Sequence, residues 1–162
     1  MKTILLFLGA FITLTATAQR KSPHDTVTNG KVTVTYGRPY KNNRDVFGSL
    51  EPYGKVWRLG ADEATTITFA NDVKFAGKTV KAGTYTLFAI PNEKEWTLIL
   101  NSELKQWGAY SYEKNKGKDI EKVSVPVKKL SSPVEQLTIR FDKSNDMIIE
   151  WDKTQVAVPV SM

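Results

Sequence analysis

The side chains best suited to recognising a ligand are concentrated in one stretch of this 162-residue sequence, from Tyr36 to Glu63. The stretch combines arginines, aromatic rings and acidic groups, and its glycines allow the backbone to turn between them. Guanidinium groups bind carboxylates and phosphates through paired hydrogen bonds, and aromatic faces stack on sugar rings or cations. We therefore predict a binding site for a carbohydrate or an anionic ligand. Its leading candidate residues are Arg38, Arg44, Trp57, Arg58 and Glu63.

Secondary candidates come from the same stretch and from an aromatic cluster farther along the chain. They are Tyr36, Lys55, Asp62, Asn101 and Trp107. The cluster Trp107–Tyr110 follows a predicted strand and suits a sugar platform, although aromatic residues at a strand end also commonly cap a core. Structural alternatives exist for the first stretch as well. In that interpretation Trp57 is a core residue, and Arg58 pairs with Asp62 or Glu63.

Motifs of the common catalytic and metal sites do not occur in the sequence. It has no cysteine, which excludes thiol chemistry and thiolate ligands, and His24 is its single histidine. The run Asp142–Asp146 alternates oxygen donors like a calcium loop, but Met147 and Lys153 stand where Gly and Glu are needed, so a hairpin turn is expected. We expect no cofactor and no metal. A metal-independent hydrolase or lyase using carboxylates, Lys55 or a tyrosine is the enzymatic alternative.

Basic residues are in modest excess, with 23 Lys and Arg against 17 Asp and Glu and a formal net charge of +6. They are scattered rather than gathered in a stripe, and no motif that reads RNA or DNA occurs, so nucleic-acid binding is not expected. A scattered excess suits a soluble surface with weak attraction to anionic polymers. The expected partners are an envelope glycan or a small anionic ligand, and the third alternative is a structural role with another protein docked on a sheet edge.

The first eighteen residues have the three parts of a signal peptide. Lys2 precedes an apolar run, Ile4–Leu14, that is too short to span a bilayer, and Ala16 and Ala18 supply the small side chains for cleavage. We expect cleavage after Ala18 and export to the periplasm or the outside of the cell. The lack of cysteine excludes a lipid-anchored lipoprotein. No later run is apolar enough to predict a transmembrane segment.

The rest of the sequence predicts one all-β domain. Residues 19–30 are polar and contain Pro23, which predicts a flexible lead-in where His24 is exposed or holds the terminus, and residues 31–162 form the domain. Apolar and polar residues alternate with a period of two in 32–36, 66–69, 85–90, 96–100, 123–127 and 137–141. Close turns and little helix favour an antiparallel, jelly-roll-like β-sandwich. The polar stretch 112–122 is expected to be a loop.

Several longer motifs give the sequence a resemblance to a known family. They are Tyr36-Gly37-Arg38-Pro39, Val46-Phe47-Gly48, the runs from Pro52 to Ala61 and from Ala82 to Phe88, and Trp107-Gly108. On these motifs the chain, from about Ser22 to Val160, resembles the DUF2911 family, exported proteins of unknown function found mainly in Bacteroidetes. The resemblance implies a β domain outside the cytoplasm and gives no substrate. The chain departs from the usual pattern of the family at Leu59, at Asp62 and at Asn42-Asn43.

Overall fold

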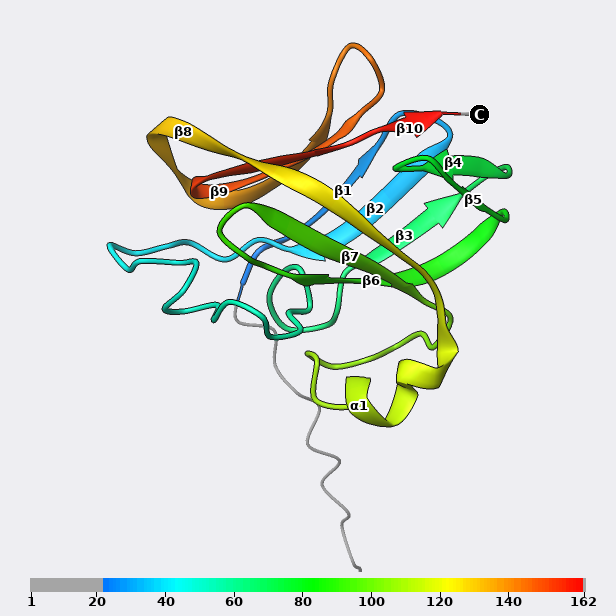
Figure 1. Ribbon diagram of the computed structural model, residues 1–162, viewed down its shortest axis with the longest axis horizontal. Helices are drawn as coiled ribbons and strands as arrows, with labels where there is room; N and C mark the ends of the chain where they lie inside the picture. Colours follow the sequence, from blue (N-terminus) through cyan, green and yellow to red (C-terminus); the bar gives the residue numbers. More distant parts are fainter. Residues whose placement is uncertain (1–21, 162) are drawn as a thin grey trace, which may run out of the picture.

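The computed structural model describes residues 22–161, so the predicted signal peptide and the first residues after it lie outside the described part. Two antiparallel sheets make up almost all of the regular structure (Figure 1). The strands are β1 (His24–Thr28), β2 (Val32–Gly37), β3 (Thr66–Phe69), β4 (Val73–Phe75), β5 (Lys78–Val80), β6 (Gly83–Ile90), β7 (Glu95–Asn101), β8 (Asp119–Phe141), β9 (Met147–Val158) and β10 (Val160–Ser161). A short helix, α1 (Tyr112–Asn115), and a 3-10 turn (Lys116–Lys118) precede β8. The prediction of an antiparallel all-β fold with little helix is confirmed.

The larger sheet has seven strands in the order β1-β2-β3-β6-β7-β8-β9. Its strands form where the sequence alternates, because successive side chains of a strand point to opposite faces. In β2 every second residue from Val32 to Tyr36 is buried, whereas Thr33 and Thr35 lie on the outer face. The register places Thr35 opposite Thr66 of β3, so threonines of neighbouring strands share that outer face.

Strand β8 is long enough to pair with two neighbours. Its first part pairs with β7 and its second part with β9, and the register shifts between Lys129 and Thr138. Pro126 lies at the end of the β7 pairing, and Pro133 lies within the shifted stretch. Proline lacks the amide hydrogen that a sheet uses, so these are positions that tolerate it. Residues 123–127 and 137–141, which the sequence predicts as two separate strands, therefore belong to one bent strand.

The chain that leaves β2 closes the curl of the large sheet. The amide of Lys41 donates to the carbonyl oxygen of Glu135 at 2.8 Å, and the amide of Leu137 donates to the carbonyl oxygen of Pro39 at 3.0 Å. Strands β2 and β8 are far apart in the strand order, yet these bonds join the segment that directly follows β2 to β8. The sheet thus wraps around the core (Figure 1).

Large aromatic side chains fill the core between the curled sheet and the smaller one. The smaller sheet has the order β10-β4-β5, and its Phe75 meets Phe69 of β3 edge-on with ring centroids 5.7 Å apart. Trp57 stacks on Trp151 at 5.9 Å and meets Trp96 edge-on at 5.8 Å. Burial of such rings is the main source of stability for a chain that has no disulfide.

Two segments differ from the form that the sequence predicts. His24–Thr28 belong to the predicted lead-in, but they form an edge strand because Val27 is half-buried and the run pairs with β2. Residues 112–122 hold α1 and the start of β8 instead of a loop. The buried ring of Tyr112, which packs 5.2 Å from the ring of Phe88, anchors that segment. In each segment, one side chain that packs against the core, Val27 or Tyr112, holds an otherwise polar stretch in regular structure.

Two glycine segments pack backbone against backbone where β2 ends. Gly37 lies against the loop Trp57–Thr65, the 57–65 loop, and a Cβ atom on Gly37 would be 2.2 Å from the carbonyl oxygen of Ala61. A Cβ atom on Gly60 would lie 3.0 Å from the carbonyl oxygen of Gly37. Glycine is required here by close approach, since no side chain fits between the two backbones. This contact fixes the loop that carries several candidate residues.

Gly37→Ala is expected to destabilise the domain by about 3 kcal/mol, because the added methyl group meets backbone that cannot turn aside. Gly117→Ala is the matched control, since a Cβ atom there has nothing within 4 Å. Its free energy of unfolding should change by less than about 0.5 kcal/mol. Urea unfolding followed by tryptophan fluorescence measures both variants. Equal stability of the two variants would contradict the contact.

Candidate functional site

The 57–65 loop is held at both ends by β6. Trp57 and Ala89 exchange two backbone hydrogen bonds of 2.7 and 2.9 Å, and the amide of Leu87 donates to the carbonyl oxygen of Thr65 at 2.8 Å. Within the loop, the amide of Thr65 donates to the carbonyl oxygen of Arg58 at 3.1 Å. This bond between Arg58 and Thr65 closes the loop into a turn of fixed shape.

Residues 104–110, the 104–110 loop, pair with the 57–65 loop in a short antiparallel ladder that we call the loop ladder. Its bridge joins Glu63 to Trp107. Backbone hydrogen bonds of 2.9 and 3.0 Å lie on either side of this bridge. Two clefts border the loop ladder, and each takes residues from both loops.

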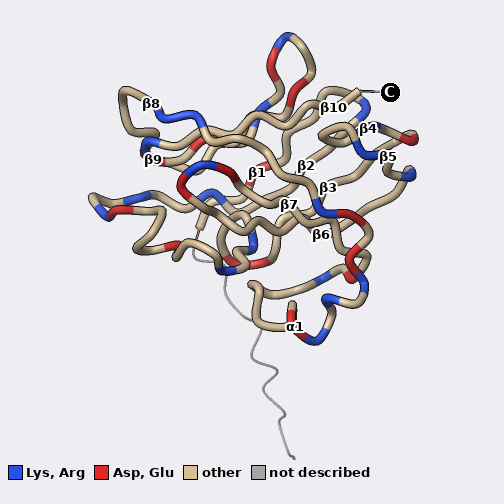
Figure 2. Tube along the Cα trace, viewed as in Figure 1, with Lys and Arg blue, Asp and Glu red and all other residues tan. Residues whose placement is uncertain are grey.

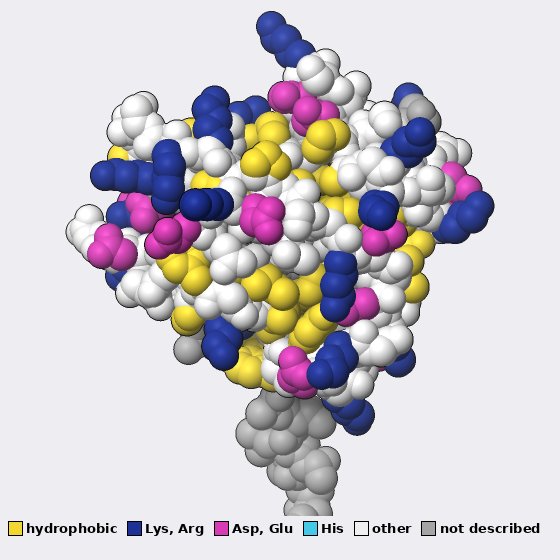
Figure 3. All heavy atoms as spheres, viewed as in Figure 1, with side chains coloured by type: hydrophobic (Ala, Val, Ile, Leu, Met, Phe, Trp, Pro, Cys, Tyr) yellow, Lys and Arg dark blue, Asp and Glu magenta, His cyan; other side chains and the backbone are white. Residues whose placement is uncertain are grey.

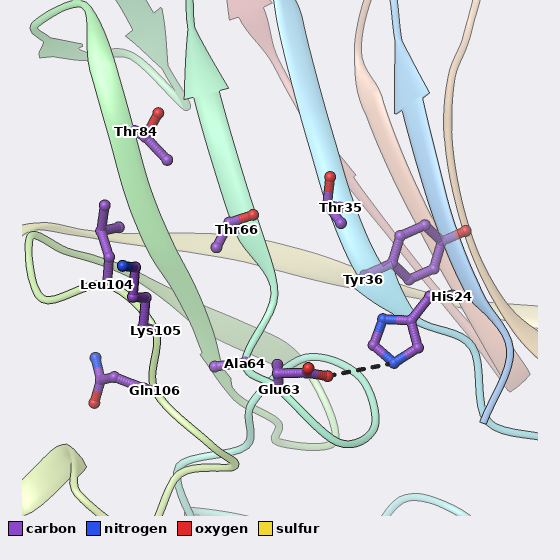
Figure 4. A pocket seen from close by; sticks show the side chains of 10 residues that line it. All are labelled: His24, Thr35, Tyr36, Glu63, Ala64, Thr66, Thr84, Leu104, Lys105 and Gln106. Atoms are coloured by element: carbon purple, nitrogen blue, oxygen red, sulfur yellow. Dashed lines mark ion pairs between the residues drawn. The ribbon is translucent and has the colours of Figure 1, made fainter. Parts of the chain in front are cut away.

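The larger cleft has a volume of about 440 Å³ and lies over the outer face of the curled sheet (Figure 4). The threonines on its floor are Thr35, Thr66 and Thr84, from β2, β3 and β6. Leu104 and Lys105 of the 104–110 loop line it from one side, and His24 and Glu63 lie at the other (Figure 4). Uncharged hydroxyl and methyl groups cover most of the floor.

His24 lies between two carboxylates beside this cleft. Its Nε2 is 3.4 Å from a carboxylate oxygen of Asp62 and 3.5 Å from one of Glu63. The amide of Ser22 also donates to Asp62, at 3.0 Å. These contacts fasten β1 to the 57–65 loop. The sequence leaves His24 either exposed or holding the terminus, and these contacts correspond to the second alternative.

The smaller cleft has a volume of about 290 Å³ and is lined by Arg58, Glu51, Tyr110 and three apolar residues, namely Val56, Trp57 and Ala109. The side chain of Tyr110 is 82% exposed. Gly108, with a φ of +65°, makes room for both polar neighbours. A Cβ atom on Gly108 would be 2.7 Å from the ring of Tyr110 and 3.0 Å from Nη1 of Arg58. The guanidinium and the open ring therefore both border the space beside Gly108. We call this the Arg58 cleft.

Glu51 places a titratable carboxyl in the Arg58 cleft. Burial raises its pKa from 4.5 to about 7, against the attraction of the Arg58 and Arg44 charges, which lowers it. Nε of Arg58 donates to the carbonyl oxygen of Gly60 at 3.2 Å, and this bond orients the guanidinium. Glu51 is not among the site residues that the sequence predicts, because its only signal there is its position in the Tyr36–Glu63 stretch.

The other leading candidates have structural contacts. Arg38 uses Nε and both Nη atoms in bonds to β1 and β8, where it helps to close the sheet. Arg44 is exposed and donates to two carbonyl oxygens of its own loop. Trp57 is 3% exposed and belongs to the core, although its edge lines the Arg58 cleft. The three arginines therefore do not converge on one cavity.

The secondary candidates also divide between structural and exposed positions. Tyr36 is buried, and its hydroxyl accepts a hydrogen bond from the amide of Ile139 at 2.8 Å. Asn101 is buried and steadies the start of the 104–110 loop, because its Oδ1 accepts from the amide of Glu103 at 2.9 Å. Lys55 is exposed and lines neither of the two clefts.

Metal-binding geometry is missing from the described residues, which hold no group of three or more His, Asp and Glu side chains suited to an ion. The run Asp142–Asp146 forms the hairpin turn expected from its sequence. Oδ1 of Asp142 accepts hydrogen bonds from the amides of Ser144 and Asp146 at 2.8 and 3.0 Å. Between residues 22 and 161, none of the helices is long and apolar enough to cross a membrane.

Charged side chains are mixed over the molecule rather than sorted by sign. Figure 2 shows Lys and Arg on nearly every part of the fold, with Asp and Glu among them. On the face seen in Figure 3, acidic and basic side chains lie side by side with hydrophobic ones between them. This face offers no continuous basic stripe of the kind that binds a nucleic-acid backbone.

Glu51→Gln should make the stability of the protein less dependent on pH. The folded-state pKa of Glu51, about 7, lies above its ordinary 4.5, so between these values the folded protein binds more protons than the unfolded chain. Stability from this group is therefore present below pH 4.5 and is lost as the pH rises through 7. The variant should gain about 1 to 3 kcal/mol at pH 8 and little at pH 4.

Urea unfolding at pH 4, 6 and 8 measures this difference. Glu95→Gln, which removes an exposed carboxyl of β7, is the matched control and should follow the wild type at each pH. If Glu51→Gln also followed the wild type, the pKa of Glu51 would not be raised in the folded protein.

One family matches almost the whole chain. Its description is "Protein of unknown function (DUF2911)", and the match covers residues 18–160. No curated protein and no solved structure matches the chain. The matched range includes both clefts, the loop ladder and the contact between Gly37 and Gly60. The chain therefore belongs to the DUF2911 family, as the motifs in its sequence predict.

Proposed function

We propose that this protein is a non-catalytic binding module for a carbohydrate or an anionic ligand, and that the Arg58 cleft is its binding site. The observation that carries the proposal is that the Arg58 guanidinium and the exposed ring of Tyr110 line one cleft and both border Gly108. An open aromatic face accepts the apolar face of a sugar ring, and a guanidinium donates hydrogen bonds to hydroxyl or anionic oxygens.

The Arg58 cleft is already shaped before a ligand arrives. Arg58 is held by its bond to Gly60, and the loop ladder fixes the two loops relative to each other. Groups that are ordered in advance lose less conformational entropy on binding. The apolar wall of Val56 and Ala109 adds surface that a ligand can cover.

We further propose that the protein acts outside the cytoplasm after its first eighteen residues are removed. The support is the sequence of the N-terminus, where the apolar run Ile4–Leu14 ends before Ala16 and Ala18. A fold held by packing and sheet hydrogen bonds, with no cysteine in the chain, is compatible with such a location.

A thermal-shift screen of the purified protein against neutral sugars, acidic sugars and small anions tests the binding site. A ligand at about 100 times its Kd should stabilise the protein by about 2.7 kcal/mol and raise Tm by several degrees. Arg58→Ala and Tyr110→Ala should each remove most of the shift in Tm, because each variant removes one of the two side chains that border Gly108.

Two exposed residues away from the cleft lining provide matched controls. Arg140→Ala removes a guanidinium that pairs with Glu150 on the β8–β9 hairpin, and Tyr40→Ala removes a ring that is 43% exposed. Both variants should keep the ligand-induced shift. The proposal fails if no sugar or anion stabilises the protein, or if the control variants lose the shift as completely as Arg58→Ala.

A further inference from the structure

We propose that the Arg58 cleft selects sugars that carry a carboxylate, with the sugar ring on Tyr110 and the carboxylate on the guanidinium of Arg58. This inference rests on the proposed function and names the ligand class of the same site. It follows from three features of the cleft. They are the two Nη atoms of Arg58, the position of Nη1 near the Tyr110 ring, and the protonation state of Glu51.

The terminal nitrogens of Arg58 supply the contact for a carboxylate. Nε is bound to the carbonyl oxygen of Gly60 at 3.2 Å, whereas Nη1 and Nη2 form no hydrogen bond with residues 22–161. The two Nη atoms of one guanidinium present N–H groups whose spacing matches the two oxygens of a carboxylate. Arg58 is half-buried, so solvent and salt screen such a pair less than one on an open surface.

The geometry at Gly108 joins the carboxylate contact to a sugar contact. Nη1 of Arg58 and the edge of the Tyr110 ring both lie within 3.0 Å of the point where a Cβ atom on Gly108 would be. A sugar ring stacked on Tyr110 therefore brings a substituent of that ring alongside Nη1. In a uronic acid this substituent is the carboxylate itself. The volume of about 290 Å³ suits one sugar unit, with any neighbouring units outside the cleft.

Glu51 does not neutralise Arg58 below neutral pH. A carboxyl in a tight ion pair with a guanidinium has a lowered pKa, but burial of Glu51 outweighs the attraction of Arg58 and Arg44 and leaves its pKa raised. At mildly acidic pH the cleft therefore contains a cationic Arg58 beside a mainly neutral Glu51, which can donate a hydrogen bond to a sugar hydroxyl. Above pH 7, ionised Glu51 repels the carboxylate of the ligand and competes for Arg58.

Calorimetric titration with glucuronate and with glucose, at pH 6 and pH 8, tests the inference on the purified protein. Glucuronate should bind at least about tenfold more tightly than glucose at pH 6, because a charge-assisted pair replaces a neutral contact. Its affinity should fall about fivefold between pH 6 and pH 8 as Glu51 ionises. The carboxylate of glucuronate stays ionised over this range, so the change belongs to the protein.

Three variants separate the contributions of Arg58 and Glu51 to the binding of glucuronate. Arg58→Gln should remove the preference for glucuronate, and Arg58→Lys should restore little of it, because a lysine keeps the charge but not the forked geometry. Glu51→Gln should keep the preference and lose the fall in affinity at pH 8. Circular dichroism and Tm establish that each variant is folded.

The outcomes distinguish this inference from the proposed function. Equal affinities for glucose and glucuronate, both lost in Arg58→Ala, would overturn the acid selectivity and leave the binding module in place. No binding of either sugar, or of any compound in the thermal-shift screen, would overturn both. Full recovery of selectivity in Arg58→Lys, or an unchanged pH dependence in Glu51→Gln, would overturn the roles given to these side chains.

Discussion

The backbone contact between the end of β2 and the 57–65 loop places the groups around both clefts. A carbonyl oxygen of the loop occupies the space where Gly37 would carry a Cβ atom, so the two segments touch without intervening side chains. The ends of the same loop are bonded to β6. The backbone contact with Gly37 and the bonds of both loop ends to β6 together fix the position of the 57–65 loop. Arg58 and Glu63 therefore belong to a segment whose position is set by backbone packing.

The loop ladder also fixes the position of the 104–110 loop, because it pairs this loop with the 57–65 loop. Without that pairing the 104–110 loop would be an exposed connection. Its bridge between Glu63 and Trp107 joins segments that are more than forty residues apart in sequence. Both clefts depend on it, because the larger takes Lys105 and the smaller takes Tyr110 from the same loop. A second glycine, Gly108, then leaves space that the side chains of Arg58 and Tyr110 both border. The site thus depends on glycines as much as on its functional groups.

The period of two in the sequence predicts β2, β3, β6, β7 and both halves of β8, because one face of each of these strands is buried. It does not predict β1, β9 or the three short strands of the smaller sheet. It could not predict that β8 changes partner, since a change of neighbour leaves no local pattern. Composition located the candidate stretch but did not identify its roles. Arg38 and Trp57 bond or stack with residues of β8 and β9, which lie far along the chain. Glu51 was missed because its altered chemistry comes from burial, which no spacing of residue types reveals.

The opposing effects of burial and of the neighbouring arginines on the pKa of Glu51 indicate what this carboxyl does in the cleft. A side chain present only to neutralise Arg58 would lie close enough to it for attraction to exceed the cost of burial, and its pKa would fall. The pKa of Glu51 rises instead, so its ionised form is disfavoured in the folded protein. Above neutral pH this arrangement costs stability, a cost that the proposed binding role would explain, because sites built for function are often not built for maximal stability. Below neutral pH, a mainly neutral Glu51 leaves the charge of Arg58 for the anionic ligand that we propose.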